Sequence, residues 1–177
     1  MINLHIGCGK RDFGPEWEGI DGADFHHVKS HDITHLEYLP NIVDNIYSSH
    51  TLEYFDREEV LPVLQEWNRV LKPEGTLYLS VPDFRTMAEL YTQQNIPLHK
   101  LLGPLFGKMP MDKQTIYHKT VWDYQSLGEY LRIAGFRRIE PWTHNELEQL
   151  VGKEFDDHSK AKINDRLISL NIKCQKQ

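Results

Sequence analysis

The sequence predicts an α/β fold in which helices cover a parallel β-sheet. Strand-like and helix-like segments alternate along the chain, which is typical of such a sheet. A helical periodicity over residues 60–71 is followed by a strand-like run at 76–81. Two glycines, Gly7 and Gly9, come directly after the first strand-like run, 2–6. With 177 residues, 40% of them hydrophobic, the chain is the size of one globular domain.

The predicted strands are short and apolar, and turn-forming residues separate them. In chain order we expect strands at 2–6, 17–21, the residues before Asp32, 43–49, 76–81, 136–141 and 167–174. Parallel strands need a crossover of roughly a dozen residues or more, usually a helix. Between Gly9 and Gly19 there is little room, because Gly14 and Pro15 use part of it. The first crossover helix is therefore expected to shrink to a turn or a short fragment.

Two helices stand out. Residues 60–71 place apolar side chains on one face, and Asp56-x-x-Glu59 resembles a capping box at the start. Pro62 is awkward in a helix interior, so we expect either a kink or a later start. The second helix, around 127–134, ends at Gly135, in a position that favours a left-handed residue.

The segment from about residue 86 to residue 115 is hard to assign, because proline and glycine interrupt any long element. We interpret it as an insertion that covers the edge of the sheet. The chain contains no internal repeat, low-complexity tract or linker, so residues 1–177 are expected to form a single domain.

Composition excludes several classes of function. The net charge is -6 and there is no Lys/Arg-rich block, so nucleic acid is not expected as a partner. Cys8 and Cys174 are too few for a disulfide framework. There is no secretory signal and no apolar run near the ~20 residues of a membrane span. We therefore expect a cytoplasmic protein without membrane insertion, and we leave self-association of the chain open.

Three features at the ends of successive strands point to a nucleoside-binding crevice. In open parallel sheets, ligands bind outside the carboxyl ends of the strands. Gly7-Cys8-Gly9 lets the backbone come close to a ligand, because glycine has no Cβ. Asp21 can accept hydrogen bonds from two ribose hydroxyls, and Asp32-Ile33 can hold an adenine amino group and its face. Read alone, each aspartate is more often a turn or cap residue.

A set of ordered motifs resembles class I S-adenosylmethionine-dependent methyltransferases. The motifs are Leu4-His5-Ile6-Gly7-Cys8-Gly9, Gly19-Ile20-Asp21, Ser49-His50-Thr51-Leu52-Glu53, Arg69-Val70-Leu71-Lys72-Pro73-Glu74-Gly75 and Ser80-Val81-Pro82-Asp83-Phe84. They are most similar to a compact subgroup of methyltransferases associated with surface polysaccharide biosynthesis. The resemblance runs nearly end to end and leaves only about 86–115 unplaced.

This resemblance implies a Rossmann-like sheet of seven mostly parallel strands, with helices on both faces and an antiparallel last strand. It implies S-adenosylmethionine as cofactor and a small-molecule or glycan acceptor as partner. The cofactor-binding residues that it implies are Gly7, Cys8, Gly9, Asp21, Asp32, Ile33, Ser49, His50 and Leu52. Two departures stand out: His5 replaces the usual acid that helps to hold the methionine end, and Lys10-Arg11-Asp12 replaces a third glycine.

Two histidines are candidates for a catalytic base. A hydroxyl or amine acceptor must lose a proton, and a histidine with a near-neutral pKa suits that task. His50 follows the fourth strand, near the expected position of the methyl group, with a role in the cofactor shelf as the alternative. His118 precedes Trp122 and can face the pocket from the other side, with a loop hydrogen bond as the alternative. Asp83 is more simply explained as a helix cap.

A metal site is not predicted. His27, His31 and His35 repeat every four residues, which would align them on a helix. However, 28–33 has the pattern of strand and loop, and no cysteine joins the group.

Two other functions compete with a methyltransferase. A dinucleotide-dependent oxidoreductase needs Gly-x-Gly-x-x-Gly and an acid ~20 residues later, whereas position 12 is Asp12 and the acid arrives early. The other is a catalytically inactive methyltransferase-fold binding or scaffold protein, which His5 and the absence of an obvious acid–base pair favour.

Overall fold

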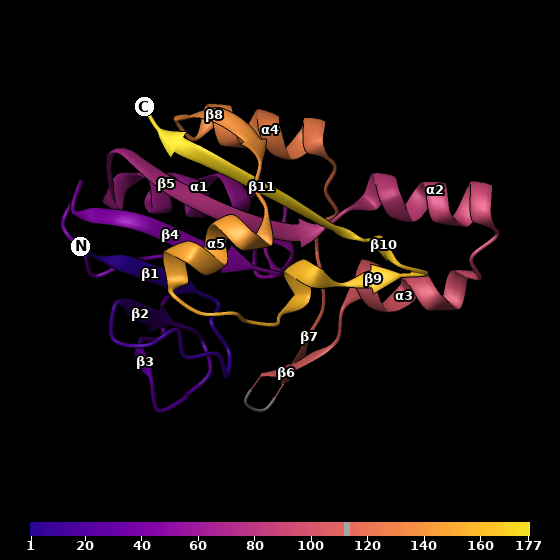
Figure 1. Ribbon diagram of the computed structural model, residues 1–177, viewed down its shortest axis with the longest axis horizontal. Coiled ribbons are helices and arrows are strands. Elements are labelled where there is room, and N and C mark those ends of the chain that lie inside the picture. Colours follow the sequence, from indigo (N-terminus) through magenta and orange to yellow (C-terminus); the bar gives the residue numbers. More distant parts are fainter. Residues whose placement is uncertain (112–113) are drawn as a thin grey trace.

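Seven strands form the central sheet of the protein. They are β1 (Asn3–Ile6), β2 (Trp17–Ile20), β3 (Val28–Ser30), β4 (Val43–Ser49), β5 (Leu71–Pro82), β8 (Phe136–Pro141) and β11 (Ser169–Lys176). The computed structural model describes residues 1–111 and 114–177. The strand order is β3-β2-β1-β4-β5-β11-β8 (Figure 1). The first five strands pair in parallel, and β11 is antiparallel to both β5 and β8. The predicted seven-stranded sheet with an antiparallel last strand is confirmed.

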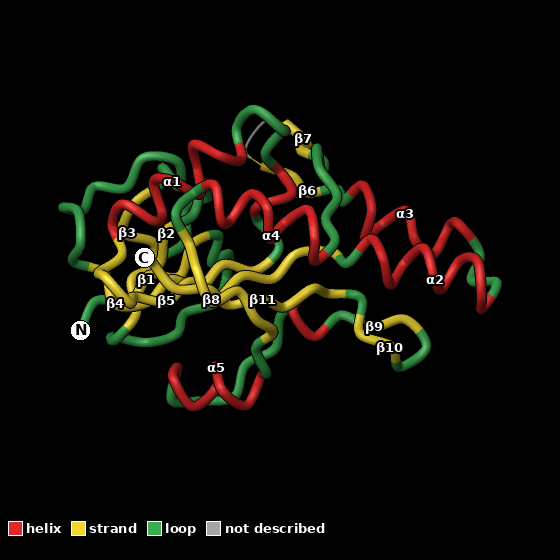
Figure 2. The backbone as a smooth tube through the Cα atoms, turned by 90° about the horizontal axis from the view of Figure 1, so that it is seen from above, coloured by secondary structure: helices red, strands yellow, loops and turns green. Residues whose placement is uncertain are grey.

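Helices cover both faces of this sheet. The α-helices are α1 (Val60–Val70), α2 (Phe84–Gln94), α3 (Leu98–Phe106), α4 (Tyr124–Ile133) and α5 (His144–Val151). Seen along the sheet, α1 and α4 lie on one face and α5 on the other (Figure 2). None of the helices in the described residues is long and apolar enough to span a membrane.

Alternating side chains of the central strands build a different core on each face, because successive residues of a strand point to opposite sides. Ile46 of β4 and Leu77 of β5 belong to the larger core, which includes Trp67 of α1. Their neighbours Tyr47 and Tyr78 belong to the second core, on the side of α5. Both cores are therefore encoded in the same two strands.

The crossover between β1 and β2 contains no helix. Residues 7–16, all of which the structure describes, form turns and extended chain. The place of a helix is taken by an aromatic cluster, in which Phe13 and Trp17 pack with Tyr47, Tyr78 and the Trp142 indole. The predicted reduction of the first helix to a turn is confirmed, and the aromatic cluster with α5 covers the face that the helix would have covered.

The start of α1 agrees with the later of the two predicted alternatives. The Asp56 carboxylate accepts a hydrogen bond from Glu59 N–H (3.0 Å), and Glu59 accepts one from Asp56 N–H (2.8 Å), so the capping box forms. Residues 57–59 make a turn, and the helix proper begins at Val60. Pro62 is then the third helical residue, where a missing N–H removes no helical hydrogen bond.

Some boundaries differ from the predicted ones. Strand β5 begins at Leu71 rather than at residue 76, and its pairing with β4 jumps from Leu71 to Thr76, so residues 72–75 are an irregularity within a longer strand. The helix predicted at 127–134 begins earlier, at Tyr124, and Gly135 after it has the expected positive φ (94°). Helix α5 was not predicted, nor was the small hairpin of β9 (Lys162–Ile163) and β10 (Arg166–Leu167).

The segment predicted as an insertion forms a pair of helices and a hairpin. Helices α2 and α3 project away from the body of the sheet (Figures 1 and 2). They pack through Met87, Leu90 and Leu101 around Ile168, which lies just before β11. The hairpin of β6 (Met109–Met111) and β7 (Gln114–Ile116) follows, and its residues 112–113 lie outside the described residues.

The N-terminus of α4 provides a test of local stabilisation. Asp123 accepts hydrogen bonds from the Ser126 N–H (2.8 Å) and the Ser126 hydroxyl (2.7 Å). We expect Asp123→Ala to lower the free energy of unfolding by about 0.5–2 kcal/mol, because these helix donors lose their acceptor. Urea denaturation measures the change, with Asp24→Ala in an exposed loop as the control. Equal stability of the two variants would contradict the capping role.

Candidate functional site

A cavity of about 770 Å³ lies at the carboxyl ends of the parallel strands. This volume is in the range of small-molecule and cofactor sites. One wall comes from the segments after β1, β2 and β4, and the opposite wall from the insertion, between Gly103 and His118. His158 and Ile168, from the chain that leads into β11, close one end. The cavity therefore brings together residues from both halves of the sequence.

The bend after β1 depends on its glycines. Gly7 has φ 70° and donates a hydrogen bond from its N–H to the Ile20 carbonyl (2.7 Å). A Cβ on Gly7 would lie 1.9 Å from the Thr51 hydroxyl oxygen, which leaves no space for any side chain. Gly9, with φ 56°, is open, since the nearest atom to its missing Cβ is an Arg11 guanidinium nitrogen at 4.0 Å. The bend is therefore packed against Thr51 at Gly7, whereas at Gly9 a ligand can approach the backbone.

Asp21 is bound directly to this bend. One carboxylate oxygen accepts a hydrogen bond from Gly9 N–H (2.8 Å), and the other accepts one from Ala23 N–H (2.8 Å). Each carboxylate oxygen can accept two hydrogen bonds, so Asp21 keeps capacity for a ligand. Its side chain lines the cavity, in agreement with the position expected for a ribose-binding acid.

The predicted cofactor residues divide into two groups. The residues that line the cavity are Gly7, Gly9, Asp21, Ile33, Ser49 and His50. Cys8, Asp32 and Leu52 are not among the lining residues.

The three residues outside the lining have structural contacts of their own. Cys8 is buried against Gly19, and burial raises the pKa of its thiol to about 12. Leu52 is fully buried in the larger core. Asp32 is exposed, and its Oδ1 accepts hydrogen bonds from Thr34 N–H, the Thr34 hydroxyl and His35 N–H. Asp32 therefore stabilises its own turn, which is the structural role that the sequence offered as the alternative to adenine binding.

A buried glutamate lies between the two predicted catalytic histidines. Glu53 has no exposed surface, and its Oε1 is 3.2 Å from His50 Nδ1 and 3.8 Å from His118 Nε2. Both histidines line the cavity. Burial lowers the pKa of His118, with Glu53 opposing the shift. We did not predict a role for Glu53, although His50-x-x-Glu53 has the spacing of one helical turn and η1 (Leu52–Tyr54) provides that turn.

His158 is a third histidine on the cavity wall, and it was also not predicted. It begins η2 (His158–Lys160), and its ring centroid is 5.4 Å from that of His50. Nothing in the local sequence marks it, because only the packing of η2 against β5 and β11 brings it to the site.

His5 cannot supply a negative charge. Its ring is buried and stacks on Phe13 with centroids 4.2 Å apart. Burial lowers the pKa of His5 to about 3, so the ring is neutral at physiological pH. It is absent from the cavity lining and belongs to the aromatic layer that replaces the first helix.

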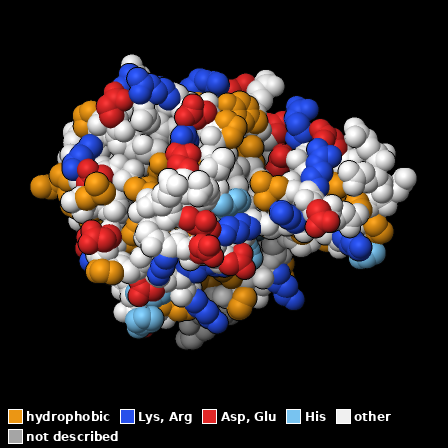
Figure 3. Space-filling model, viewed as in Figure 1, with side chains coloured by type: hydrophobic (Ala, Val, Ile, Leu, Met, Phe, Trp, Pro, Cys, Tyr) orange, Lys and Arg blue, Asp and Glu red, His pale blue; other side chains and the backbone are white. Residues whose placement is uncertain are grey.

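Basic side chains lie on both walls of the cavity. Among the described lining residues, the lysines and arginines are Lys10, Arg11 and Lys108, whereas Asp21 is the single carboxylate. Arg11 is oriented by a hydrogen bond from its Nε to the Asp156 carbonyl (2.9 Å). Elsewhere, on the face shown in Figure 3, acidic and basic side chains are interspersed. The cavity is thus locally basic in a chain whose net charge is -6.

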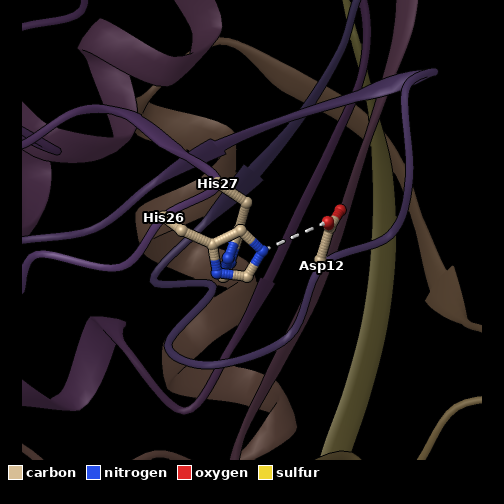
Figure 4. Close-up of side chains that lie close together, drawn as sticks. All are labelled: Asp12, His26 and His27. Atoms are coloured by element: carbon tan, nitrogen blue, oxygen red, sulfur yellow. Dashed lines mark ion pairs between the residues drawn. The ribbon is translucent and has the colours of Figure 1, made fainter.

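Within the described residues, one group has the residue types and spacing to hold a metal ion. Asp12, His26 and His27 place their ligand atoms within 4.8 Å of one another, and Asp12 Oδ2 lies 4.0 Å from His26 Nε2 (Figure 4). None of the three lines the cavity. This group differs from the histidines considered in the sequence, His27, His31 and His35, because His31 and His35 take no part in it.

The comparisons agree with the fold. Residues 16–79 match the profile of a methyltransferase domain family. The fold resembles PH0226 from Pyrococcus horikoshii OT3, at 15% identity and a TM-score of 0.60, covering 99% of this chain and 82% of the other. It also resembles an S-adenosylmethionine-dependent methyltransferase from Methanosarcina mazei, at 16% identity and a TM-score of 0.59, covering 99% of this chain and 92% of the other. A third similar structure is an S-adenosylmethionine-dependent methyltransferase from Archaeoglobus fulgidus, at 15% identity and a TM-score of 0.59, covering 99% of this chain and 86% of the other. No curated protein sequence matches the chain.

At these identities the structural likeness shows the fold, which is that of the S-adenosylmethionine-dependent methyltransferases. The matched segment runs from the end of the first crossover into β5 and includes Asp21, Ser49 and His50. The likeness therefore shows the fold, and the profile match covers the part of the chain from residue 16 to residue 79.

A side chain at Gly7 would have two costs, the contact with Thr51 and the positive φ, and these two costs can be measured separately. We expect Gly7→Ala to destabilise the protein more than Gly152→Ala, because Gly152 also has a positive φ (80°) but nothing within 4 Å of its missing Cβ. A left-handed residue alone costs about 1–2 kcal/mol, and overpacking adds about 1–3 kcal/mol. Urea denaturation of both variants gives the difference, and equal losses would show that Thr51 yields without cost.

The buried His5 predicts a pH dependence of stability. Its folded-state pKa of about 3 lies below the ordinary value near 6.5, so the unfolded state binds the proton more tightly. Its contribution to stability is therefore present above pH 6.5 and is lost as pH falls towards 3, by about 1.4 kcal/mol per pH unit. We expect His5→Phe, which retains an aromatic ring beside Phe13, to remove this part of the slope. Denaturation at pH 4.5, 5.5 and 7 tests it, and parallel curves for variant and wild type would contradict it.

Proposed function

We propose that this protein is an S-adenosylmethionine-dependent methyltransferase that acts on a small or carbohydrate-like acceptor in the cytoplasm. The observation that carries the proposal is the joint placement of the Gly7–Gly9 bend and the Asp21 carboxylate on one cavity at the strand ends. An open bend beside a carboxylate suits a nucleoside, because the backbone can approach the ligand closely while the acid accepts from ribose hydroxyls.

The residues on this wall fit the cofactor. Asp21 accepts the ribose hydroxyls, and the Ile33 side chain offers an apolar surface to the base. Arg11, fixed over the bend by Asp156, supplies a positive charge for the methionine carboxylate. When bound, S-adenosylmethionine supplies an electrophilic methyl group for an in-line displacement, so positioning contributes much of the acceleration.

The acceptor occupies the part of the cavity that the insertion forms. Pro104, Met109 and Met111 give this wall an apolar surface, and Lys108 adds one positive charge. Methionine side chains adapt to irregular shapes, which suits a wall that must fit a varied small molecule. A glycan acceptor and a role in surface polysaccharide biosynthesis come from the sequence resemblance alone.

His50 and His118 lie on the cavity wall, with the buried Glu53 carboxyl group between them. Both rings lie beside the space that a cofactor and an acceptor would share, and both approach the same carboxyl oxygen. Their catalytic roles stay predictions of the sequence.

An inactive methyltransferase-fold binding protein is the second candidate. The observation in its favour is His5, whose neutral ring occupies the position at which the sequence resemblance implies an acid. Such a protein would bind the cofactor without turnover, so a binding assay alone does not separate the two.

The proposed function is tested first by titration calorimetry with S-adenosylmethionine, S-adenosylhomocysteine and NAD. We expect binding of the first two and none of NAD, which would exclude the oxidoreductase. Turnover is then measured on a panel of sugars by formation of S-adenosylhomocysteine. Tight binding without turnover on any sugar of the panel would favour the inactive binding protein.

The two predicted carboxylates can be compared directly. We expect Asp21→Asn to weaken S-adenosylmethionine affinity by about tenfold to 100-fold, because a charge-assisted hydrogen bond contributes about 1.5–3 kcal/mol. Asp32→Asn should have a smaller effect, since Asp32 stabilises its own turn and is not among the lining residues. Calorimetry gives both affinities, and thermal denaturation checks that each variant is folded. A larger loss at Asp32 would reverse the assignment.

A further inference from the structure

Three histidines line the cavity, and their hydrogen bonds distinguish them. A histidine can take a proton from an acceptor only if one ring nitrogen has a free lone pair that faces the ligand. The rings concerned are His50, His118 and His158. The position of each proton follows from the groups that each nitrogen faces.

Both nitrogens of His50 are occupied. The Ser169 hydroxyl donates to the His158 carbonyl (2.6 Å), so its oxygen accepts the proton of His50 Nε2 at 2.9 Å. His50 Nδ1 faces Glu53 Oε1 at 3.2 Å. A neutral His50 would therefore direct a lone pair at a carboxyl group, and no nitrogen would remain for an acceptor.

His118 also faces Glu53, at a longer distance, and its side chain is only 7% exposed. Its Nδ1 lies 3.2 Å from the Pro104 carbonyl, which can only accept, so Nδ1 carries a proton. Its Nε2 faces Glu53 Oε1 at 3.8 Å. The Glu53 side chain is fully buried, and neither oxygen has a hydrogen-bond donor among the described residues. A carboxylate that faces two lone pairs would be an uncompensated buried charge.

The buried Glu53 carboxyl group therefore needs a hydrogen-bond partner, and the rings of His50 and His118 are the described groups that face it. His50 and His118 are thus committed to the buried acid rather than to the cavity.

His158 differs from the other two. Within the described part of the chain its ring makes no hydrogen bond, and its side chain is exposed at the cavity. Its backbone is held firmly, because the carbonyl accepts from Ser169 and the adjacent Asp157 caps the turn through Ser159 N–H (2.8 Å). The turn that carries His158 is therefore fixed, and no hydrogen bond within the described residues competes for the lone pair of its ring.

Resting on the function proposed above, we propose that His158 is the base that removes the proton from the acceptor, while Glu53 holds His50 in place beside it. The proton would move from an O–H or N–H group of the acceptor to a nitrogen of His158, and the bonding pair would stay on the acceptor atom. That atom would form the new bond to the methyl carbon as the carbon–sulfur bond breaks, with its electron pair left on sulfur. His158 becomes an imidazolium and releases the proton to solvent. The acceptor therefore belongs to the hydroxyl or amine class.

The charges around His158 support this role. Burial lowers the pKa of His158, and the nearby His50 and Arg11 lower it further, while Asp157 and Glu53 oppose them. A ring with a lowered pKa is neutral at pH 7 and keeps its lone pair.

The protonation pattern is tested by ¹⁵N NMR of histidine rings, with assignments from single His→Gln variants. At pH 7 we expect a neutral His158 and a protonation state of His50 or His118 that changes in Glu53→Gln. A doubly protonated His158 would overturn the proposal. So would ¹⁵N signals of the His50 and His118 rings that are the same in Glu53→Gln as in the wild type. This measurement needs no acceptor and no turnover.

The catalytic role is tested with His158→Gln on the sugar that turns over in the panel. We expect kcat to fall by about 10²-fold to 10⁴-fold, with S-adenosylhomocysteine affinity unchanged and the acidic limb of the pH profile lost. His99→Gln, which removes an exposed histidine of α3, is the matched control and should retain full activity. Full activity of His158→Gln refutes the assignment. A wild type that does not bind S-adenosylmethionine refutes the proposed function instead, and the NMR pattern still decides the protonation states.

Discussion

The short connection between β1 and β2 is the constraint on which the rest of the structure depends. A parallel pair is normally joined through a helix that also covers the sheet, but residues 7–16 have no room for one. The exposed face must still be buried, and aromatic residues from distant parts of the chain do this instead. Phe13 comes from the connection and Trp17 from the start of β2, while Trp142 precedes α5 and Leu147 lies within it. The N-terminal and C-terminal regions are therefore packed together across one face of the sheet.

The replacement of the first crossover helix by an aromatic cluster also shapes the cavity. Because no helix follows the Gly7–Gly9 bend, the bend is bordered by Arg11 and by the chain around Asp156. The same C-terminal segment then continues into η2 and places His158 on the cavity wall. A histidine more than a hundred positions from His50 in the sequence thus comes to lie against its ring. The aromatic cluster and the candidate site are consequences of the same missing helix.

The second constraint is electrostatic. Glu53 is buried, no group in the described part of the chain donates a hydrogen bond to it, and a buried charge is expensive unless it is paired. Its two histidine neighbours are themselves fixed by Ser169 and by the Pro104 carbonyl. The sheet, η1 and the insertion therefore meet at one carboxyl group, and the protonation of that group connects the fold to the proposed chemistry. Pro104 belongs to α3, so the insertion contributes to this network as well as to the cavity wall.

Much of the fold was predictable because it follows from local pattern. Alternating apolar runs identified the strands, and the capping box and Gly135 marked helix ends. The short segment between Gly9 and Gly19 predicted a turn or a short fragment in place of the first helix. The order of the strands and the antiparallel β11 required a resemblance to known proteins. Helix α5 was missed, although Thr143 caps it and Gly152 ends it with a positive φ.

The sequence by itself determined the strand-end bend and the placement of Asp21, because both depend on residues adjacent to a strand and on the geometry of glycine. Tertiary structure decided which residues reach the cavity. It placed the Asp32 carboxylate against its own backbone, buried Cys8 and Leu52, and brought His158 beside His50. The physical reason is that a side chain's partners depend on how separate elements pack, and local sequence does not encode contacts between residues more than a hundred positions apart.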